Sequence, residues 1–232
     1  SYLILDKYQL YSNFSQGVVI DPYAMYVQQG LERGNSTRGE FGFKYHSAET
    51  LLTKRTVAIE HPWWLNCTTY TQRTQDDIFW LEGVPQNDDT VRYGTELSVH
   101  GQILAQWNAF FSYNEQYARF TSGLYTGRSM PLVPGMQYSA GLTYLYSQAW
   151  SITLIERYIS QQWAMNDVLN EQERLPAYDL VDLRADYAWK DLVLFLSVNN
   201  LFDRKYNVFE RYRTFPAGDY YIPGARRMWQ LG

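Results

Sequence analysis

The chain has 232 residues, a formal net charge of -4 and a mean hydropathy of -0.41. The acidic balance excludes a nucleic-acid-binding domain, which needs a basic surface. The single cysteine, Cys67, excludes an intrachain disulfide and a zinc site built on paired cysteines. No apolar run approaches about 18 residues, which excludes a transmembrane helix. His46, His61 and His100 lie far apart in sequence and form no metal-binding motif.

Apolar and polar residues alternate from one end of the chain to the other, with the period of two that is typical of β-strands. Within the first third of the chain, for example, Phe41, Phe43 and Tyr45 alternate with polar side chains. We predict about ten strands, each of about 10 residues or more, which is enough to cross a bilayer at a tilt. The clearest stretches are 7–16, 40–46, 91–100, 106–114, 137–147, 150–154, 178–190 and 191–199.

The predicted connections alternate between short and long. Short turns are expected near residues 101–105, 147–149 and 190–191, and long polar loops near 17–35, 83–89, 121–136, 161–177 and 203–224. Barrels of outer membranes have short turns on one side and long loops on the other. Residues 47–62 fall where a short turn is expected, and the alternation leaves open whether they form a strand pair, a helical turn or an insertion.

Residues 178–190, YDLVDLRADYAWK, show the strongest alternation. One face is apolar and ends in Tyr187 and Trp189, while the other carries Asp182, Arg184 and Asp186. Aromatics make up 17% of the chain, and Tyr and Trp favour the boundary between lipid and water. The pattern therefore predicts a membrane barrel with lipid outside and a polar lumen inside. We expect the three charged residues to form a ladder of cross-strand ion pairs along the wall, with contact to a plug as the alternative. The girdle residues expected at the interface are Trp63, Trp64, Trp80, Trp150 and Trp189.

The C-terminal third contains motifs that resemble a known family. Residues 195–206, FLSVNNLFDRKY, are similar to the penultimate-strand signature of TonB-dependent outer-membrane receptors, and residues 220–227, YYIPGARR, are similar to the family's approach to its last strand. Further matches run upstream in the family's order. They are RYGTE at 92–96, DDI at 76–78, GRSMPLVP at 127–134 and LPAY at 175–178.

The resemblance implies an all-β fold, an antiparallel transmembrane β-barrel located in the outer membrane of a Gram-negative cell. In this family a barrel of about 22 strands encloses an N-terminal plug. We expect residues 1–232 to supply about ten C-terminal strands of such a barrel, with the plug domain and the segment that engages TonB absent from this sequence.

The resemblance also implies a ligand, most often a ferric siderophore and sometimes cobalamin or haem, taken up with energy from TonB acting through the plug region. Partners are therefore this ligand, TonB and outer-membrane lipid, with no resident cofactor, metal or catalytic residue. Arginine and aromatic side chains in the long loops suit an anionic, aromatic iron chelate. The candidate ligand-binding residues are Tyr125, Arg128, Trp163, Arg174, Arg211, Tyr212 and Arg213. Loop packing or lipopolysaccharide contact is the alternative role for each.

Other functions fit the sequence less well. An enzyme is not expected, because the chain shows no nucleophile next to a base and no cluster of acids with a histidine. A passive porin-like channel would also be a barrel, but porins lack the two C-terminal motifs. A soluble β-rich binding module is the third alternative, and it would dissolve without detergent.

Overall fold

A computed structural model of the chain describes residues 2–5, 7–19, 34–47, 63–214 and 217–232. These residues form thirteen strands, and the described part of the chain contains no helix long and apolar enough to cross a membrane. The strands are β1 (Tyr2–Leu5), β2 (Tyr8–Val19), β3 (Gly34–His46), β4 (Trp63–Leu81), β5 (Val84–Leu104), β6 (Trp107–Phe120), β7 (Met136–Leu145), β8 (Trp150–Ile159), β9 (Tyr178–Trp189), β10 (Leu192–Asn199), β11 (Asn207–Thr214), β12 (Ala217–Pro223) and β13 (Met228–Leu231).

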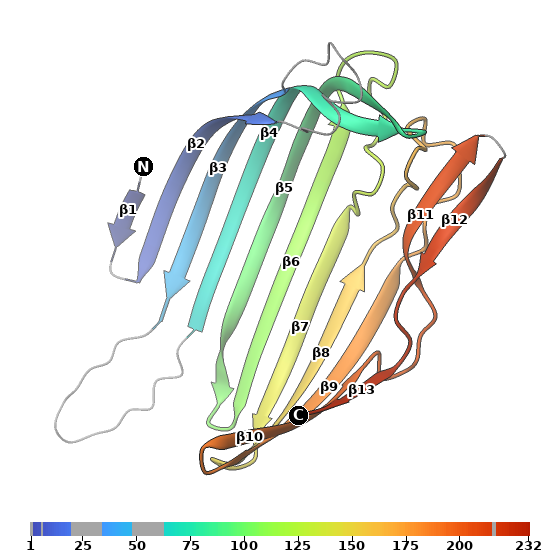
Figure 1. The fold of residues 1–232 in the computed structure, drawn as a ribbon. Coiled ribbons are helices and arrows are strands. Elements are labelled where there is room, and N and C mark those ends of the chain that lie inside the picture. Colours follow the sequence, from blue (N-terminus) through green and yellow to red (C-terminus); the bar gives the residue numbers. More distant parts are fainter. Residues whose placement is uncertain (1, 6, 20–33, 48–62, 215–216) are drawn as a thin grey trace.

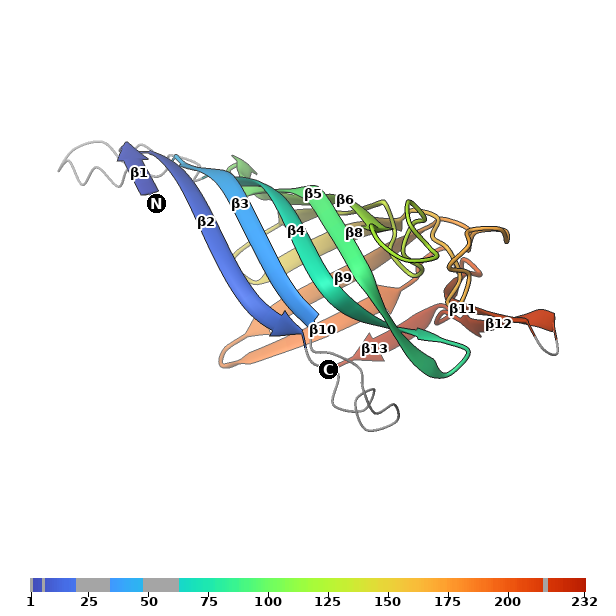
Figure 2. The same ribbon diagram turned by 90° about the horizontal axis from the view of Figure 1, so that it is seen from above.

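Eleven of these strands form one antiparallel sheet in the order β1 to β10 followed by β13. Figure 1 shows the strands side by side, with short turns at one end and loops at the other. Seen from above, the sheet curls into an open arc, and its edge strands β1 and β13 do not pair with each other (Figure 2). β11 and β12 form a separate hairpin at the loop end. The all-β antiparallel fold is therefore confirmed, as an unclosed segment of a barrel.

The register of the strands sorts the side chains onto two faces with different chemistry. In β9, Asp182, Arg184 and Asp186 share one face, and Leu183 and Ala185 lie on the other. We call the polar face inner and the apolar face outer, because lipid contacts the apolar surface of a membrane barrel. The outer face contains Phe41, Phe43, Leu65, Leu97, Val99, Phe111, Leu142, Ile152, Leu154, Leu194 and Leu196.

Ion pairs join the charged side chains of the inner wall. Arg157 on β8 pairs with Asp182, and Arg184 donates to Asp186 at 2.7 Å. Arg184 also lies over the ring of Phe195 on β10, with 4.2 Å between guanidinium and ring centre. The predicted ladder of cross-strand ion pairs is therefore present only in part, because Arg157–Asp182 joins two strands whereas Arg184–Asp186 lies within β9.

Aromatic rings lie flat over glycines at two places on the inner face. Tyr11 is opposite Gly42, and Phe110 is opposite Gly141. A Cβ added to Gly42 would lie 2.2 Å from the Tyr11 ring, and one added to Gly141 would lie 2.0 Å from the Phe110 ring. Each glycine therefore provides the space that its neighbour's ring occupies.

A row of three rings crosses the inner face near the turn end. Trp64 stacks on His100 at 4.8 Å and lies 5.2 Å from His46. Because these residues are in register with inward positions, the prediction that Trp64 is a lipid-facing girdle residue is wrong. Trp63 and Trp64 are adjacent, so the period of two forces one of them inward.

Several predicted connections differ in the structure. Residues 83–89 are not a loop, because β4 and β5 continue as a hairpin that turns at Glu82 and Gly83. The turn expected at 101–105 lies at residues 105–106, and most of the loop at 203–224 is the β11–β12 hairpin. The turns at 147–149 and 190–191 and the irregular segments at 121–135 and 161–177 are confirmed. The expectations for residues 20–33 and 48–62 lie outside the described residues.

Candidate functional site

The loop end of the sheet is built from three segments, namely residues 121–135, residues 161–177 and the β11–β12 hairpin (Figure 1). The first segment folds back along the edge of β6. The Phe120 amide donates to Arg128 O at 3.0 Å, and the Met130 amide donates to Ala118 O at 2.9 Å. This pairing extends the wall beyond the regular strands and fixes the segment to it.

A small apolar core holds the base of this segment. Ala118, Phe120, Met130 and Val168 are buried together. The ring of Tyr125 lies 5.6 Å from Phe120 and 5.8 Å from Phe79 and packs against this core. The structure therefore places Tyr125 in loop packing, the alternative role considered for it from sequence.

Two asparagines in the 161–177 segment connect the loops to one another. Asn170 accepts from the Ser129 amide at 2.7 Å and donates to Ser129 O at 3.0 Å. Asn166 donates to Tyr212 O at 2.9 Å and accepts from the Glu82 amide at 3.2 Å. The segment thus joins the 121–135 loop, the β4–β5 hairpin and the β11–β12 hairpin into one layer.

Local turns hold these asparagines in position. Both have positive φ, 75° for Asn166 and 57° for Asn170, a conformation that asparagine tolerates better than most residues. Buried Asp167 accepts hydrogen bonds from the amides of Glu171 and Gln172 at 3.0 and 3.1 Å. Sequence reasoning missed all three residues, although Asn and Asp within a stretch without periodicity are a known turn signal.

Trp163 and Arg174 meet on the same segment. The Arg174 guanidinium lies 4.4 Å from the centre of the Trp163 ring, within the range of a cation–π interaction. Both residues border a hollow of about 370 Å³, together with Glu115 and Arg119 of β6. Two of the candidate ligand-binding residues from the sequence therefore contact each other beside this hollow. Arg128, which is exposed, does not line this hollow.

The cluster at 211–213 is divided among different roles. The Tyr212 amide donates to Met165 O at 2.9 Å, so this residue joins two segments through its main chain. Arg213 lies over the Tyr220 ring at 4.4 Å. The Arg211 Nε is buried and has no hydrogen-bond partner among the described residues. The three residues adjacent in sequence do not form one cationic patch.

The hairpin also contains a buried carboxyl group. Glu210 is 4% exposed, and burial is the main cause that raises its pKa above the ordinary value. A hydrogen bond from the Tyr221 hydroxyl acts in the opposite direction, whereas Asp219 raises the pKa further. The backbone oxygen of Glu210 accepts from the Met165 amide at 2.8 Å. The hairpin is thus attached to the 161–177 segment by two backbone hydrogen bonds of Met165, one to Glu210 O and one from the Tyr212 amide.

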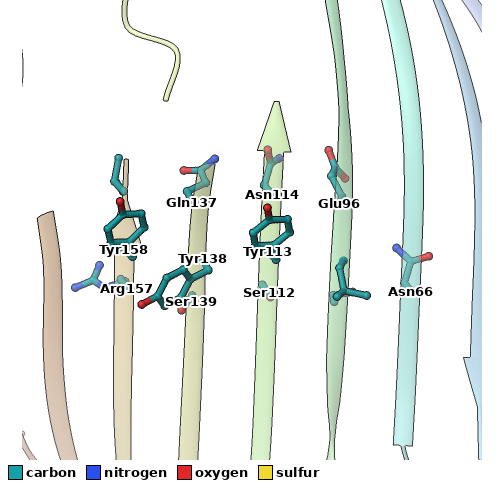
Figure 3. Close-up of a pocket in the computed structure, with 13 residues that line it drawn as sticks. Asn66, Glu96, Ser112, Tyr113, Asn114, Gln137, Tyr138, Ser139, Arg157 and Tyr158 are labelled. Carbon is teal, nitrogen blue, oxygen red and sulfur yellow. The ribbon is translucent and has the colours of Figure 1, made fainter. Parts of the chain in front are cut away.

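A hollow of about 420 Å³, lined by both polar and apolar side chains, lies against strands β4 to β8 (Figure 3). Glu96, Asn114 and Gln137 come from three neighbouring strands and are in register on inward positions. The Asn114 Oδ1 is buried without a hydrogen-bond partner in the described structure. These amide and carboxylate groups make the wall here suited to polar contacts. Within the described ranges, no group of three or more His, Cys, Asp or Glu side chains could hold a metal ion.

Comparison with solved structures shows the same fold in three larger proteins. The ferric yersiniabactin uptake receptor FyuA from Yersinia pestis has a TM-score of 0.77 at 19% identity, over 99% of this chain and 35% of that one. The copper transporter OprC has a TM-score of 0.75 at 19% identity, over 97% of this chain and 36% of that one. The ferripyoverdine receptor of the outer membrane of Pseudomonas aeruginosa, bound to ferripyoverdine, has a TM-score of 0.70 at 17% identity, over 98% of this chain and 31% of that one.

The chain therefore spans about a third of the length of these structures. No curated protein sequence matches it. The family model described as TonB dependent receptor-like, beta-barrel matches residues 1–201, which is most of the chain and includes every strand from β1 to β10. By this match and by its fold, the chain belongs to the TonB-dependent receptor family, as a part of the receptor's β-barrel.

Proposed function

We propose that this chain forms wall and ligand-binding loops of a receptor that takes up a ferric siderophore across the outer membrane of a Gram-negative cell. The observation that carries the proposal is the connected loop layer, which presents arginine–aromatic pairs at Trp163–Arg174 and Arg213–Tyr220. Members of the family are receptors and transporters, so the prediction that the chain is not an enzyme is confirmed. Membership of a barrel family leaves the soluble-module alternative without support.

The chemistry of these pairs suits an anionic ligand with aromatic groups. A guanidinium that lies on a ring keeps its in-plane N–H donors available for a carboxylate or a phenolate oxygen. The ring can stack on an aromatic group of the chelate. Of the residues considered from sequence, Trp163, Arg174 and Arg213 best fit direct contact, and exposed Arg128 adds a third cationic group. Tyr125, Arg211 and Tyr212 support the loops that present them.

Uptake of a bulky chelate through such a barrel requires a gate and a source of energy. We propose that a plug held inside the complete barrel provides the gate and that TonB acts on it. The inner wall supports this proposal, because its ion pairs and amide groups offer polar contacts to a domain in the lumen. FyuA and the ferripyoverdine receptor are named for iron chelates, whereas OprC is named for copper. Copper is therefore a competing ligand, and cobalamin and haem are the others that the family resemblance implies.

The test is a binding and uptake assay with the complete protein that contains this chain, expressed in outer membranes with and without functional TonB. The ligands are a ferric catecholate, ferric citrate, haem, cobalamin and copper ion. We expect one ferric chelate to bind and to enter cells only when TonB is functional. We expect the Trp163→Ala, Arg174→Ala double variant to bind it about tenfold more weakly, since loss of a cation–π and ion-pair contact costs about 1–2 kcal/mol.

The control is Lys190→Ala, which removes a cation in the turn between β9 and β10, at the other end of the sheet, and should leave binding unchanged. Entry of the ligand without TonB would instead indicate a passive channel. Binding of copper, cobalamin or haem in preference to every ferric chelate would contradict the siderophore assignment.

A further inference from the structure

Three rings form a row across the inner face close to its turn end. His46 on β3 is in register with Trp64 on β4, and Trp64 is in register with His100 on β5. Phe110 on β6 follows in the same register. Three residue steps separate Phe110 from Trp107 at the start of β6, which is about 10 Å along a strand at about 3.4 Å per residue. The ring row of His46, Trp64 and His100 therefore lies near the end of the sheet opposite the loop layer.

Two of these rings overlap face to face and leave their edges toward the lumen. The centres of the Trp64 and His100 rings are 4.8 Å apart with 13° between the ring planes, and coplanar rings side by side could not come so close. Ring edges carry the positive part of the aromatic quadrupole, and the indole and imidazole N–H groups lie at these edges. The ring row therefore offers positive edges and hydrogen-bond donors to an anion.

Two hollows of the inner wall share Trp64 and His100 as lining residues. The first, of about 360 Å³, is also lined by Lys7, Lys44 and His46, and the second has a volume of about 320 Å³. No aspartate or glutamate is among the described residues that line either hollow. The side chains of Lys44 and of all three residues of the ring row are exposed. This part of the wall is therefore accessible, aromatic and rich in basic groups.

The lysines of the first hollow differ from the charged residues elsewhere on the inner wall. Arg157 and Arg184 each form an ion pair with an aspartate. Lys7 and Lys44 take part in none of the ion pairs found in the described ranges. Lys44 instead lies over the Tyr11 ring, with 4.9 Å between Nζ and the ring centre. An ammonium group held on a ring keeps its N–H donors, so the hollow retains a positive potential that attracts an anion.

We propose that the ring row, Lys7 and Lys44 form a second ligand site, which holds an aromatic anion at the turn end of the lumen on its way out of the barrel. Its role in transit rests on the proposed function, whereas its affinity for such an anion does not. An aromatic group whose face meets the edges of Trp64 and His100 takes the T-shaped geometry that aromatic pairs favour. The Lys44 ammonium and the histidine N–H groups donate to carboxylate, phenolate or sulfonate oxygens of the same molecule.

The loop layer at the other end of the sheet has related chemistry. There the Arg174 guanidinium lies 4.4 Å from the centre of the Trp163 ring. A ligand that such a pair selects for negative charge and aromatic groups carries the same features that the ring row and Lys44 recognise. The two ends of the wall therefore suit one class of molecule, first at capture and then at release.

The test measures binding of pyranine, a water-soluble aromatic trisulfonate, to the complete protein that contains this chain. Fluorescence anisotropy in a nonionic detergent reports the bound fraction. The reference protein carries Trp163→Ala and Arg174→Ala, so that the pair in the loop layer does not contribute to binding. We expect this reference protein to bind pyranine at the ring row.

Two variants of the reference protein remove different parts of the site. The Lys44→Gln, His46→Gln, His100→Gln variant loses the ammonium group and two ring edges and should bind pyranine at least tenfold more weakly. Trp64→Leu removes a ring without changing the charge and should weaken binding about fivefold. Lys190→Gln is the matched control, since it removes a cation in the turn between β9 and β10 and should leave binding unchanged.

Absence of pyranine binding to the reference protein would overturn the proposal. Equal binding by the reference protein and both variants of the ring row would do the same, as would an equal loss in the Lys190 variant. Entry of vancomycin into cells that carry the triple glutamine variant and lack TonB, with pyranine binding unchanged, would show that the ring row holds a plug instead of a ligand.

A second readout tests the role in transit and uses intact loops. For the ferric chelate that the receptor takes up, the triple glutamine variant should keep the wild-type Kd at the cell surface and lose severalfold in TonB-dependent uptake. Uptake at the wild-type rate would overturn the role in transit. Absence of uptake in wild type, together with pyranine binding at the ring row, would refute the proposed function and leave the anion site in place, so the two failures are distinguishable.

Discussion

Arginines on the inner and outer faces of the same strands differ in their ion-pair partners. On the inner face the arginines have carboxylate partners on the same or the next strand, as in Arg157 with Asp182. On the outer face Arg73 and Arg119 stand in a row near the loops without such partners among the described residues. Arginines that face the lumen are therefore paired within the wall, whereas the two outward arginines near the loops have no partner in the described part of the wall.

The most direct test of this comparison places the same charge on either face of β5. Leu97 is an outward residue in register with Cys67 and Tyr113, and Ser98 is the next residue, which points inward. Leu97→Arg should lower the free energy of unfolding by about 2–4 kcal/mol, because an arginine near the bilayer midplane is costly. Ser98→Arg should cost much less. Urea titration of the complete protein in lipid vesicles measures both, and equal costs would contradict the assignment of the faces.

Breaking an inner ion pair should have the next largest effect. Asp77 is 5% exposed and accepts from the Thr90 hydroxyl at 2.7 Å and from Arg92 at 2.8 Å. Asp77→Ala leaves Arg92 without its partner and should cost about 3 kcal/mol, the lower end for a buried pair because Arg92 is partly exposed. The Asp77→Ala, Arg92→Met double variant should recover most of the loss. A double variant no more stable in urea than the single one would disprove the explanation.

The loop layer can be loosened without touching the wall. Asn166 is buried and bonds to both Tyr212 O and the Glu82 amide. Asn166→Ala removes both contacts and should destabilise the layer by about 2 kcal/mol. Hydrogen exchange of β11 should then accelerate, while exchange in β6 to β8 should stay at the wild-type rate. Gln161→Ala, an exposed change in the same loop, is the control and should leave exchange in β11 unaltered.

The glycine positions test how closely the inner rings lie against the wall. Gly141→Ala places a methyl group where the Phe110 ring now lies and should cost about 1–2 kcal/mol. Phe110→Ala in the same molecule removes the clash, so the second substitution should cost less in the Gly141→Ala background than alone. Thermal unfolding of the four proteins in detergent gives the coupling. Additive effects would mean that the two residues do not touch.

The smallest effect is expected from an exposed ion pair beside β10. Arg226 donates to Asp203, and with the Arg227 amide at 3.0 Å it lowers the pKa of Asp203 to about 2. The unfolded chain has a pKa of about 3.9, so stability from this pair is full above that value and is lost as the pH falls through about 2. Asp203→Asn should remove this pH dependence. The carboxyl carbon shift of Asp203 measures the pKa, and a value near 3.9 in the folded protein would refute the pairing.

Alternation of side chains was sufficient to predict most of the sheet. The strands at 137–147 and 178–190 lie where the pattern places them because lipid on one face and polar groups on the other leave no second register. The pattern failed at residues 83–89, where Pro85 and a run of polar residues suggested a loop. There β4 and β5 stay paired as far as Leu81 and Val84, through residues whose alternation is too weak to predict a strand.

The loop contacts were less accessible to sequence reasoning. Trp163 and Arg174 were named as candidates from the chemistry of one short loop, but their contact with each other was not predicted. The roles of Asn166 and Asn170 were not predicted either, because their partners Tyr212 and Ser129 are about 40 residues away along the chain. Such contacts depend on how separate loops meet above the sheet. Neither propensity nor periodicity carries that information.

The rings laid over Gly42 and Gly141 have a consequence for anything that moves past the wall. At both places an aromatic ring covers the glycine, so that no side chain projects from the inner surface there. The Tyr11 hydroxyl also forms a hydrogen bond with the Thr68 hydroxyl on β4, which holds the Tyr11 ring in place. A molecule that moves along this wall would meet a smooth surface at these two positions, with few projecting side chains to contact.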